Sequence, residues 1–250
     1  MIPARFVVSA AFVAIITLST SAFAAERPQR VSWSGFYGGI NGGYGWGSPT
    51  GHLSWESAAT NTFNAPLADS NYTPHTGGAL GGLQLGYNYQ INTAVIGAEV
   101  DFQFSDVSGS TTTPSTLLPN AGPDFAHFSA SQRLEMFGTL RGRAGFLAAD
   151  SLLLFATAGL AYGQIKSETH WQYDTAPFVS YVGTETKTKI GYAIGGGGEW
   201  AINRAWSVKV EYLYLDFGTI RTASGNVGFF TTFDQKTASN LVRVGLNYHF

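Results

Sequence analysis

Apolar and polar residues alternate along most of this chain, and the alternation restricts the fold more than any other feature. The last nine residues show it clearly. One face there carries only apolar side chains, at Val242, Val244, Leu246, Tyr248 and Phe250. The residues between them are polar or small. Successive side chains of a β-strand point to opposite faces, so a period of two predicts strands. We therefore expect an all-β fold.

Turn signals divide the chain into eight runs of this kind. The predicted strands lie near residues 33–47, 75–90, 93–106, 131–148, 151–166, 186–201, 206–218 and 238–250. Tight turns join three pairs of them, at residues 91–92, 149–150 and 202–205. The other four connections are long and rich in Ser, Thr, Asn, Gly and Pro, at residues 48–74, 107–130, 167–185 and 219–237. This alternation of connection lengths is typical of an eight-stranded antiparallel up-and-down transmembrane β-barrel.

A soluble barrel of the lipocalin type also has eight strands, but its apolar face is inside. Composition favours an apolar face that meets lipid, because charged residues make up only 12% of the chain, about half of the usual soluble share. Aromatic residues, 14% of the chain, gather near the strand ends and predict two interfacial girdles. Those near turns or the terminus are Tyr87, Tyr89, Phe146, Trp200, Trp206 and Phe250. Those near long connections are Tyr44, Trp46, Phe102, Phe104 and Tyr214.

Charged residues of both signs lie on the faces opposite to the apolar ones, which would point into the lumen. The expected lumen network consists of Glu99, Asp101, Glu135, Arg141, Arg143, Lys209, Glu211 and Arg243. Three further charges share this phase, Arg133, Lys189 and Glu199. Desolvated charges need partners, so we favour a paired network that plugs the lumen. A narrow polar path for ions or small solutes is the alternative.

The N-terminus reads as a secretory signal peptide. Arg5 precedes an apolar run over residues 6–20, and Ala22 and Ala24 offer small residues for cleavage. The run is too short to span a bilayer comfortably as an anchor. We expect a cleaved signal peptide at 1–24, a short periplasmic segment at 25–32 and the barrel at 33–250. The longest later apolar candidate for a transmembrane helix, residues 152–162, is also too short.

Several function classes find no support in the sequence. Cysteine is absent, which excludes disulfides and thiolate chemistry. A formal net charge of −2 makes nucleic acid an unfavourable partner. The glycine runs at 42–45 and 195–198 lack the context of a phosphate-binding loop, and no spacing suggests a metal site. No motif joins a nucleophile to any histidine. We expect no catalytic residues and no cofactor.

The long connections offer a further function class, binding at the cell surface. Loops on a rigid scaffold commonly carry binding sites. Aromatic residues in them would serve a surface adhesin or a haem-binding protein: Trp55, Phe63, Phe125, Trp171, Phe229, Phe230 and Phe233.

Five segments resemble a known family, the small outer-membrane proteins of alphaproteobacteria, called porin-family or RopB-type and related in architecture to the OmpA transmembrane barrel. These segments are residues 33–47, 81–90, 95–101, 138–145 and 242–250. The resemblance implies a barrel in the bacterial outer membrane that contributes to envelope integrity. It implies contact with outer-membrane lipid and lipopolysaccharide, and it makes Tyr248 and Phe250 part of a C-terminal signal for the barrel-assembly machinery. The oligomeric state stays open.

Overall fold

Eight long strands dominate the computed structural model, which describes residues 31–55, 71–118, 124–174, 180–226 and 229–250. The expected signal peptide, 1–24, lies outside these residues. The long strands are β1 (Gly35–Gly47), β4 (Thr76–Ile91), β5 (Ala94–Thr112), β7 (Asp124–Ala149), β8 (Leu152–Tyr173), β9 (Ser180–Ala201), β10 (Trp206–Asn226) and β11 (Phe229–His249). Three short strands accompany them, β2 (Gly51–Trp55), β3 (Asn71–Tyr72) and β6 (Thr116–Leu118).

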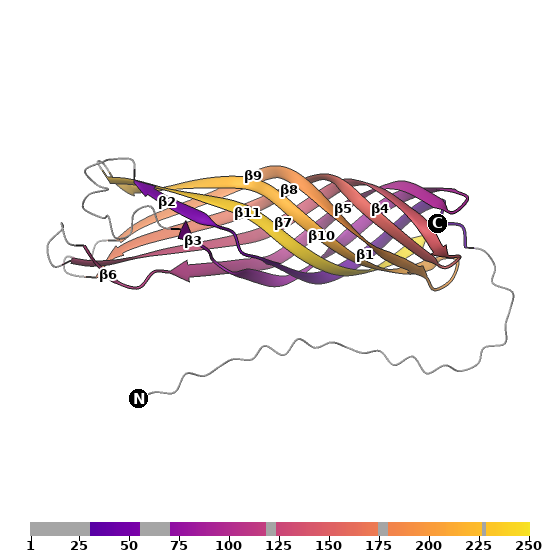
Figure 1. Ribbon diagram of the computed structural model, residues 1–250, viewed down its shortest axis with the longest axis horizontal. Helices are drawn as coiled ribbons and strands as arrows, with labels where there is room; N and C mark the ends of the chain where they lie inside the picture. The colour runs from indigo at the N-terminus through magenta and orange to yellow at the C-terminus, as the bar shows by residue number, and fades with distance from the viewer. Residues whose placement is uncertain (1–30, 56–70, 119–123, 175–179, 227–228) are drawn as a thin grey trace, which may run out of the picture.

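The long strands form one closed antiparallel sheet (Figure 1). Each pairs with the next along the chain, and β1 pairs with β11 from Tyr37↔His249 to Trp46↔Asn240, which closes the circle. The predicted eight-stranded up-and-down barrel is confirmed. The three tight turns also lie within one residue of their predicted positions, and Asn92 takes a positive φ (55°), which suits a tight turn. We call the end with these turns the turn end, and the opposite end the ribbon end.

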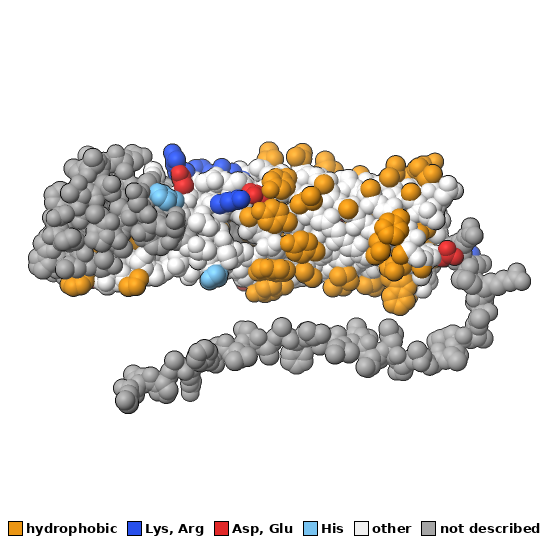
Figure 2. Space-filling model, in the orientation of Figure 1, with side chains coloured by type: hydrophobic (Ala, Val, Ile, Leu, Met, Phe, Trp, Pro, Cys, Tyr) orange, Lys and Arg blue, Asp and Glu red, His pale blue; other side chains and the backbone are white. Residues whose placement is uncertain are grey.

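An apolar band surrounds the half of the barrel nearest the turn end (Figure 2). Leu83, Leu140 and Leu160 are about 60% exposed in its middle. Exposed aromatic residues lie along both borders, as predicted, except that Tyr214 is only half-buried rather than exposed. Within the described residues, no helix is long and apolar enough to cross a bilayer. The apolar faces of the strands therefore point outward.

A charged side chain in the middle of the apolar band should destabilise the barrel. Leu140 is 58% exposed there, next to Val100 and Leu160 on the neighbouring strands. We expect Leu140→Arg to lower the free energy of unfolding in lipid vesicles by about 2–4 kcal/mol. Ser129→Arg, on the same strand but at the ribbon end, should change it by less than about 0.5 kcal/mol. Equal effects of the two substitutions would contradict the position of the band.

The long connections are mostly strand rather than loop, which corrects the expectation for residues 107–130, 167–185 and 219–237. Strands β7 to β11 run on beyond the apolar band in ladders such as Ser129↔His170 and Ser224↔Thr231. These segments combine Ser with Thr, Val and aromatic residues, a composition that favours strands as well as hydration. The ribbon end is therefore an extension of the barrel wall.

The barrel wall divides into two sheets at the ribbon end. The β9–β10 ladder ends at Tyr192↔Asp216, next to Gly218 at φ +73°. Beyond this point toward the ribbon end, in the part of the chain that the structure describes, β9 pairs only with β8 and β10 only with β11. The two sheets meet inside, where the Phe128 and Phe233 ring centroids are 5.4 Å apart.

A β-bulge at Glu135 corrects the predicted alternation on β7. The β7–β8 register shifts between Leu134 and Met136. One extra residue in a strand reverses the inward and outward positions on one side of the bulge relative to the other side. Arg133 is therefore exposed on the outer surface, whereas Leu134 is 4% exposed and points inside, opposite to the predicted arrangement. Glu135 itself leaves the lumen.

Candidate functional site

Buried charged residues fill the lumen in the half of the barrel that the apolar band surrounds. Four bases and four acids lie there, none more than 5% exposed. They are Arg141, Arg143, Lys209 and Arg243 with Glu99, Asp101, Glu199 and Glu211. Alternation places them on inward faces of β5, β7, β9, β10 and β11. We call these eight residues the lumen network, and their formal charges cancel.

Arg141 lies at the centre of the lumen network. Its guanidinium donates hydrogen bonds to three carboxylates, those of Glu99, Asp101 (2.9 Å) and Glu211 (2.6 Å). Its Nε donates to the Thr139 hydroxyl at 2.8 Å. A planar guanidinium presents its donors in a fixed fork, so Arg141 holds the acids of β5 and β10 in one arrangement. The side chain of Arg141 is fully buried.

Two more bases share these carboxylates. Lys209 Nζ donates to both oxygens of Glu99, at 2.8 and 2.7 Å. Arg243 Nη2 donates to Asp101 at 3.2 Å and to Glu211. Each of these acids therefore has at least two cationic partners, which reduces the cost of keeping it charged and buried.

Arg143 forms a second centre closer to the turn end. It donates to the Tyr37 hydroxyl at 2.9 Å and to Glu199 at 2.8 Å, and it lies 4.1 Å from the centre of the Phe155 ring. Tyr37 in turn donates to Glu99 at 2.7 Å, which joins the two centres. Glu199 also accepts hydrogen bonds from Ser207 and Asn247.

The structure places seven of the eight residues predicted for the lumen network inside the lumen. The exception is Glu135, which the bulge removes, and Glu199 takes part instead. The sequence analysis named only charged residues for this network and did not include its neutral hydrogen-bond partners. They are Tyr37, Asn41, Gln84, Thr139, Ser207 and Asn247. Tyr248 and Phe250 point outward at the turn end, 40% and 80% exposed.

Apolar layers cover the lumen network on both sides. Toward the turn end, Trp33, just before β1, is fully buried among Val95, Leu153, Phe155 and Ala201. Toward the ribbon end, a larger cluster fills the lumen with Leu80, Val107, Leu134, Phe137, Ala161, Ile165, Ala193, Leu213, Leu215, Phe217, Ile220 and Leu241. The network therefore lies between two apolar layers.

Gly86 leaves space for Tyr37. A Cβ at Gly86 would come within 2.3 Å of the Tyr37 ring, which is held by Glu99 and Arg143. We expect Gly86→Ala to destabilise the barrel by about 1–3 kcal/mol, measured by urea unfolding in lipid vesicles, because Tyr37 cannot move without breaking these bonds. Gly81→Ala on the same strand is the control, since its Cβ would meet nothing closer than 3.5 Å. Equal stability of both variants would contradict this packing.

The described residues contain no group of three or more His, Asp or Glu that could hold a metal ion.

Known proteins are similar to this chain in sequence and in fold. The family model described as the outer membrane protein β-barrel domain matches residues 10–250. The chain is 36% identical to the 31 kDa outer-membrane immunogenic protein of Brucella melitensis biotype 1, over 100% of this chain and 97% of that protein. It is 28% identical to the 22 kDa outer membrane protein of Rhizobium leguminosarum bv. viciae, over 79% of each.

Among solved structures, the outer membrane protein OprG from Pseudomonas aeruginosa has a similar fold. The TM-score is 0.54 at 12% sequence identity, and the match covers 88% of this chain and 98% of OprG. The fold, the outward apolar band and the sequence matches agree: this chain belongs to the outer membrane protein β-barrel family and is a protein of the bacterial outer membrane.

Proposed function

We propose that this protein is a non-catalytic structural barrel whose lumen is closed by its own side chains, and that it supports the integrity of the outer membrane. The observation that carries the proposal is the stack of an apolar layer, the neutral lumen network and a second apolar layer. An eight-stranded barrel has an interior just wide enough for side chains to fill.

Both layers oppose permeation. An ion would have to pass the buried Trp33 cluster at one end and the Phe137 cluster at the other, and apolar constrictions hinder ions by dewetting. Between them, it would have to separate carboxylates from Arg141, and each separated charge would remain buried. A pore for small solutes would require several such pairs to separate together.

The serine, histidine and acid at the turn end do not favour catalysis. Ser207 Oγ lies 2.9 Å from His249 Nε2, and Glu199 lies 3.6 Å from the same nitrogen. In a catalytic triad the acid instead orients the other ring nitrogen, Nδ1. Ser207 is also fully buried, so a substrate cannot reach its hydroxyl in this conformation.

The ribbon end supports surface binding less strongly than the sequence suggests. Trp171 and Phe233, two of the aromatic residues expected to anchor a ligand, are buried inside the ribbon end, whereas Phe125 is 43% exposed. Trp55, Phe229 and Phe230 lie in strands, but their side chains are outside what the structure describes, as is all of Phe63. Adhesion and haem binding therefore rank below the structural role.

A deletion strain tests the structural role. We expect loss of the gene to increase sensitivity to detergents and to large antibiotics, and the wild-type protein to restore resistance. A variant lacking the ribbon end beyond the apolar band should restore it too if the closed barrel is the working part. Unchanged resistance in the deletion strain, combined with slower uptake of a small solute, would favour the narrow pore instead.

We also propose that Tyr248 and Phe250, together with the outward apolar face of β11 that precedes them, serve assembly. Val242, Val244, Leu246 and Tyr248 lie on the lipid-facing side of this strand, and Phe250 follows it. Their exposure leaves these side chains accessible to the barrel-assembly machinery before the barrel is surrounded by lipid.

A further inference from the structure

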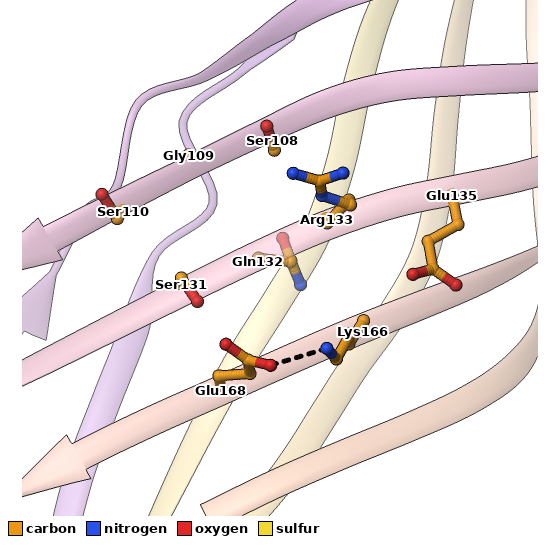
Figure 3. Close-up of a pocket in the computed structure, with 9 residues that line it drawn as sticks. All are labelled: Ser108, Gly109, Ser110, Ser131, Gln132, Arg133, Glu135, Lys166 and Glu168. Atoms are coloured by element: carbon orange, nitrogen blue, oxygen red, sulfur yellow. Dashed lines mark ion pairs between the residues drawn. The ribbon is translucent and has the colours of Figure 1, made fainter.

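A pocket of about 360 Å³ lies on the outer face of the ribbon end, over β5, β7 and β8. Figure 3 shows its polar side chains, which come from these three neighbouring strands. Two cations, Arg133 and Lys166, lie among serine hydroxyls and two carboxylates. The residues that line the pocket include Arg133, Lys166, Ser108, Ser131, Glu135 and Glu168.

The bulge at Glu135 creates this pocket. On the ribbon-end side of the bulge, Arg133 faces outward and is directly opposite Lys166 in the β7–β8 ladder. Like charges directly opposite each other destabilise a strand pair, so an arrangement of this kind is suited to an anion between them. Ser108 is the direct partner of Arg133 on the other side, in β5, and adds a hydroxyl donor.

The existing partners of the two cations are replaceable. Arg133 pairs with Asp106 at 3.3 Å, and Lys166 with Glu168 at 2.7 Å. The four side chains are 35–73% exposed. The hydrogen bond from Lys166 lowers the pKa of Glu168, so Glu168 is charged near neutral pH. Exposed ion pairs contribute little stability, so a more highly charged ligand can displace them.

The height of the pocket favours a lipid headgroup as its ligand. Tyr162 lies on the border of the apolar band, and Lys166 follows it by four residues on the same face of β8. Four residues span roughly 13 Å along a strand, which at a tilt of 35–45° is about 10 Å of height. The polar headgroups add about 5–8 Å on each side of the hydrocarbon core, so the long side chain of Lys166 lies within reach of their outer part.

We propose that this pocket binds a phosphate group of lipid A, the phosphorylated glycolipid that anchors lipopolysaccharide in the outer leaflet. Arg133 would bind the phosphate oxygens through its guanidinium fork, Lys166 through its charge and Ser108 through its hydroxyl. A phosphate monoester carries about 1.5 to 2 negative charges, more than either carboxylate that it displaces. The proposal rests on the outer-membrane barrel of the proposed function, in which the long connections, here the ribbon end, face the outside and the short turns face the periplasm.

Binding to purified, refolded protein in detergent micelles tests the site. We expect wild-type protein to bind diphosphorylated lipid A at least tenfold more tightly than dephosphorylated lipid A. Inorganic phosphate at millimolar concentration should not compete, because it lacks the acyl chains that hold the ligand against the apolar band. Arg133→Gln/Lys166→Gln should lose most of the preference. Equal binding of the two lipids, or displacement by inorganic phosphate, would overturn the assignment to a lipid.

Two matched variants make the test specific. Arg221→Gln/Lys187→Gln removes the same charge from the ribbon end outside the pocket, from residues paired with Asp234 and Glu185. It should bind lipid A as the wild type does. Glu168→Gln removes the competitor of Lys166 and should strengthen binding severalfold. An equal loss in both double variants would show a general charge effect and would overturn the site, as would weaker binding by Glu168→Gln.

The lipid A measurement is independent of the closed lumen. Heat-modifiable gel migration checks that each variant is folded. A closed lumen without a lipid A preference contradicts this site alone, whereas a conducting lumen with a lipid A preference contradicts the proposed function alone.

Discussion

Replacing Arg141 with alanine is expected to lower the free energy of unfolding by about 3–5 kcal/mol, or to prevent refolding. The substitution removes the hydrogen bonds that Arg141 donates to Glu99, Asp101 and Glu211. These carboxylates stay buried, and a buried charge without a sufficient partner is expensive. Urea unfolding of refolded protein in lipid vesicles, followed by tryptophan fluorescence, measures the loss.

Arg133→Ala is the matched control for Arg141→Ala. Both arginines belong to β7, but Arg133 is exposed and pairs only with the exposed Asp106 among the contacts described for it. We expect a change of less than about 1 kcal/mol. Similar losses at Arg133 and Arg141 would mean that the lumen network is hydrated and weakly coupled, contrary to the proposed plug.

Phe137→Ala should have a comparably large effect for a different reason. Phe137 is fully buried in the apolar layer above the lumen network, among Leu134, Ile165 and Leu213. Removing a buried aromatic ring from a close-packed layer costs about 3–5 kcal/mol, because the surrounding side chains fill the cavity only partly. The same urea titration measures the effect.

The control for Phe137→Ala is Phe137→Leu, which keeps an apolar side chain of moderate size at this position. It should cost less than half as much as the alanine variant. A loss below about 1 kcal/mol for Phe137→Ala would show that water already fills this part of the lumen, which would weaken the case for a closed barrel.

The sequence predicted the strands inside the membrane well, because lipid on one side and packed polar groups on the other impose a strict period of two. The alternation around Val244 and Val210 therefore assigned both faces correctly. The same alternation assigned the wrong faces to β7 on the ribbon-end side of Glu135, because the extra residue reverses them there. No composition signal marks that bulge, because Arg133 and Glu135 both suit a polar lumen and a polar surface.

The candidate site was only partly predictable. Charged residues at inward positions indicated Arg141 and Glu211, since charges do not face lipid. Neutral residues such as Tyr37 gave no such signal, because its position among the glycines of the first strand suits either face. The buried Trp33 was not predicted to close the lumen, since it precedes the strand and its burial depends on Leu153 and Val95, which are distant in sequence.

Planar-bilayer conductance of the refolded protein tests the closed lumen most directly. The lumen network and its two apolar layers predict that folded, inserted protein produces no discrete, reproducible channel steps. Reproducible steps, altered in size by Arg141→Ala or Glu211→Ala, would show that these residues line an ion path and would contradict the closed barrel.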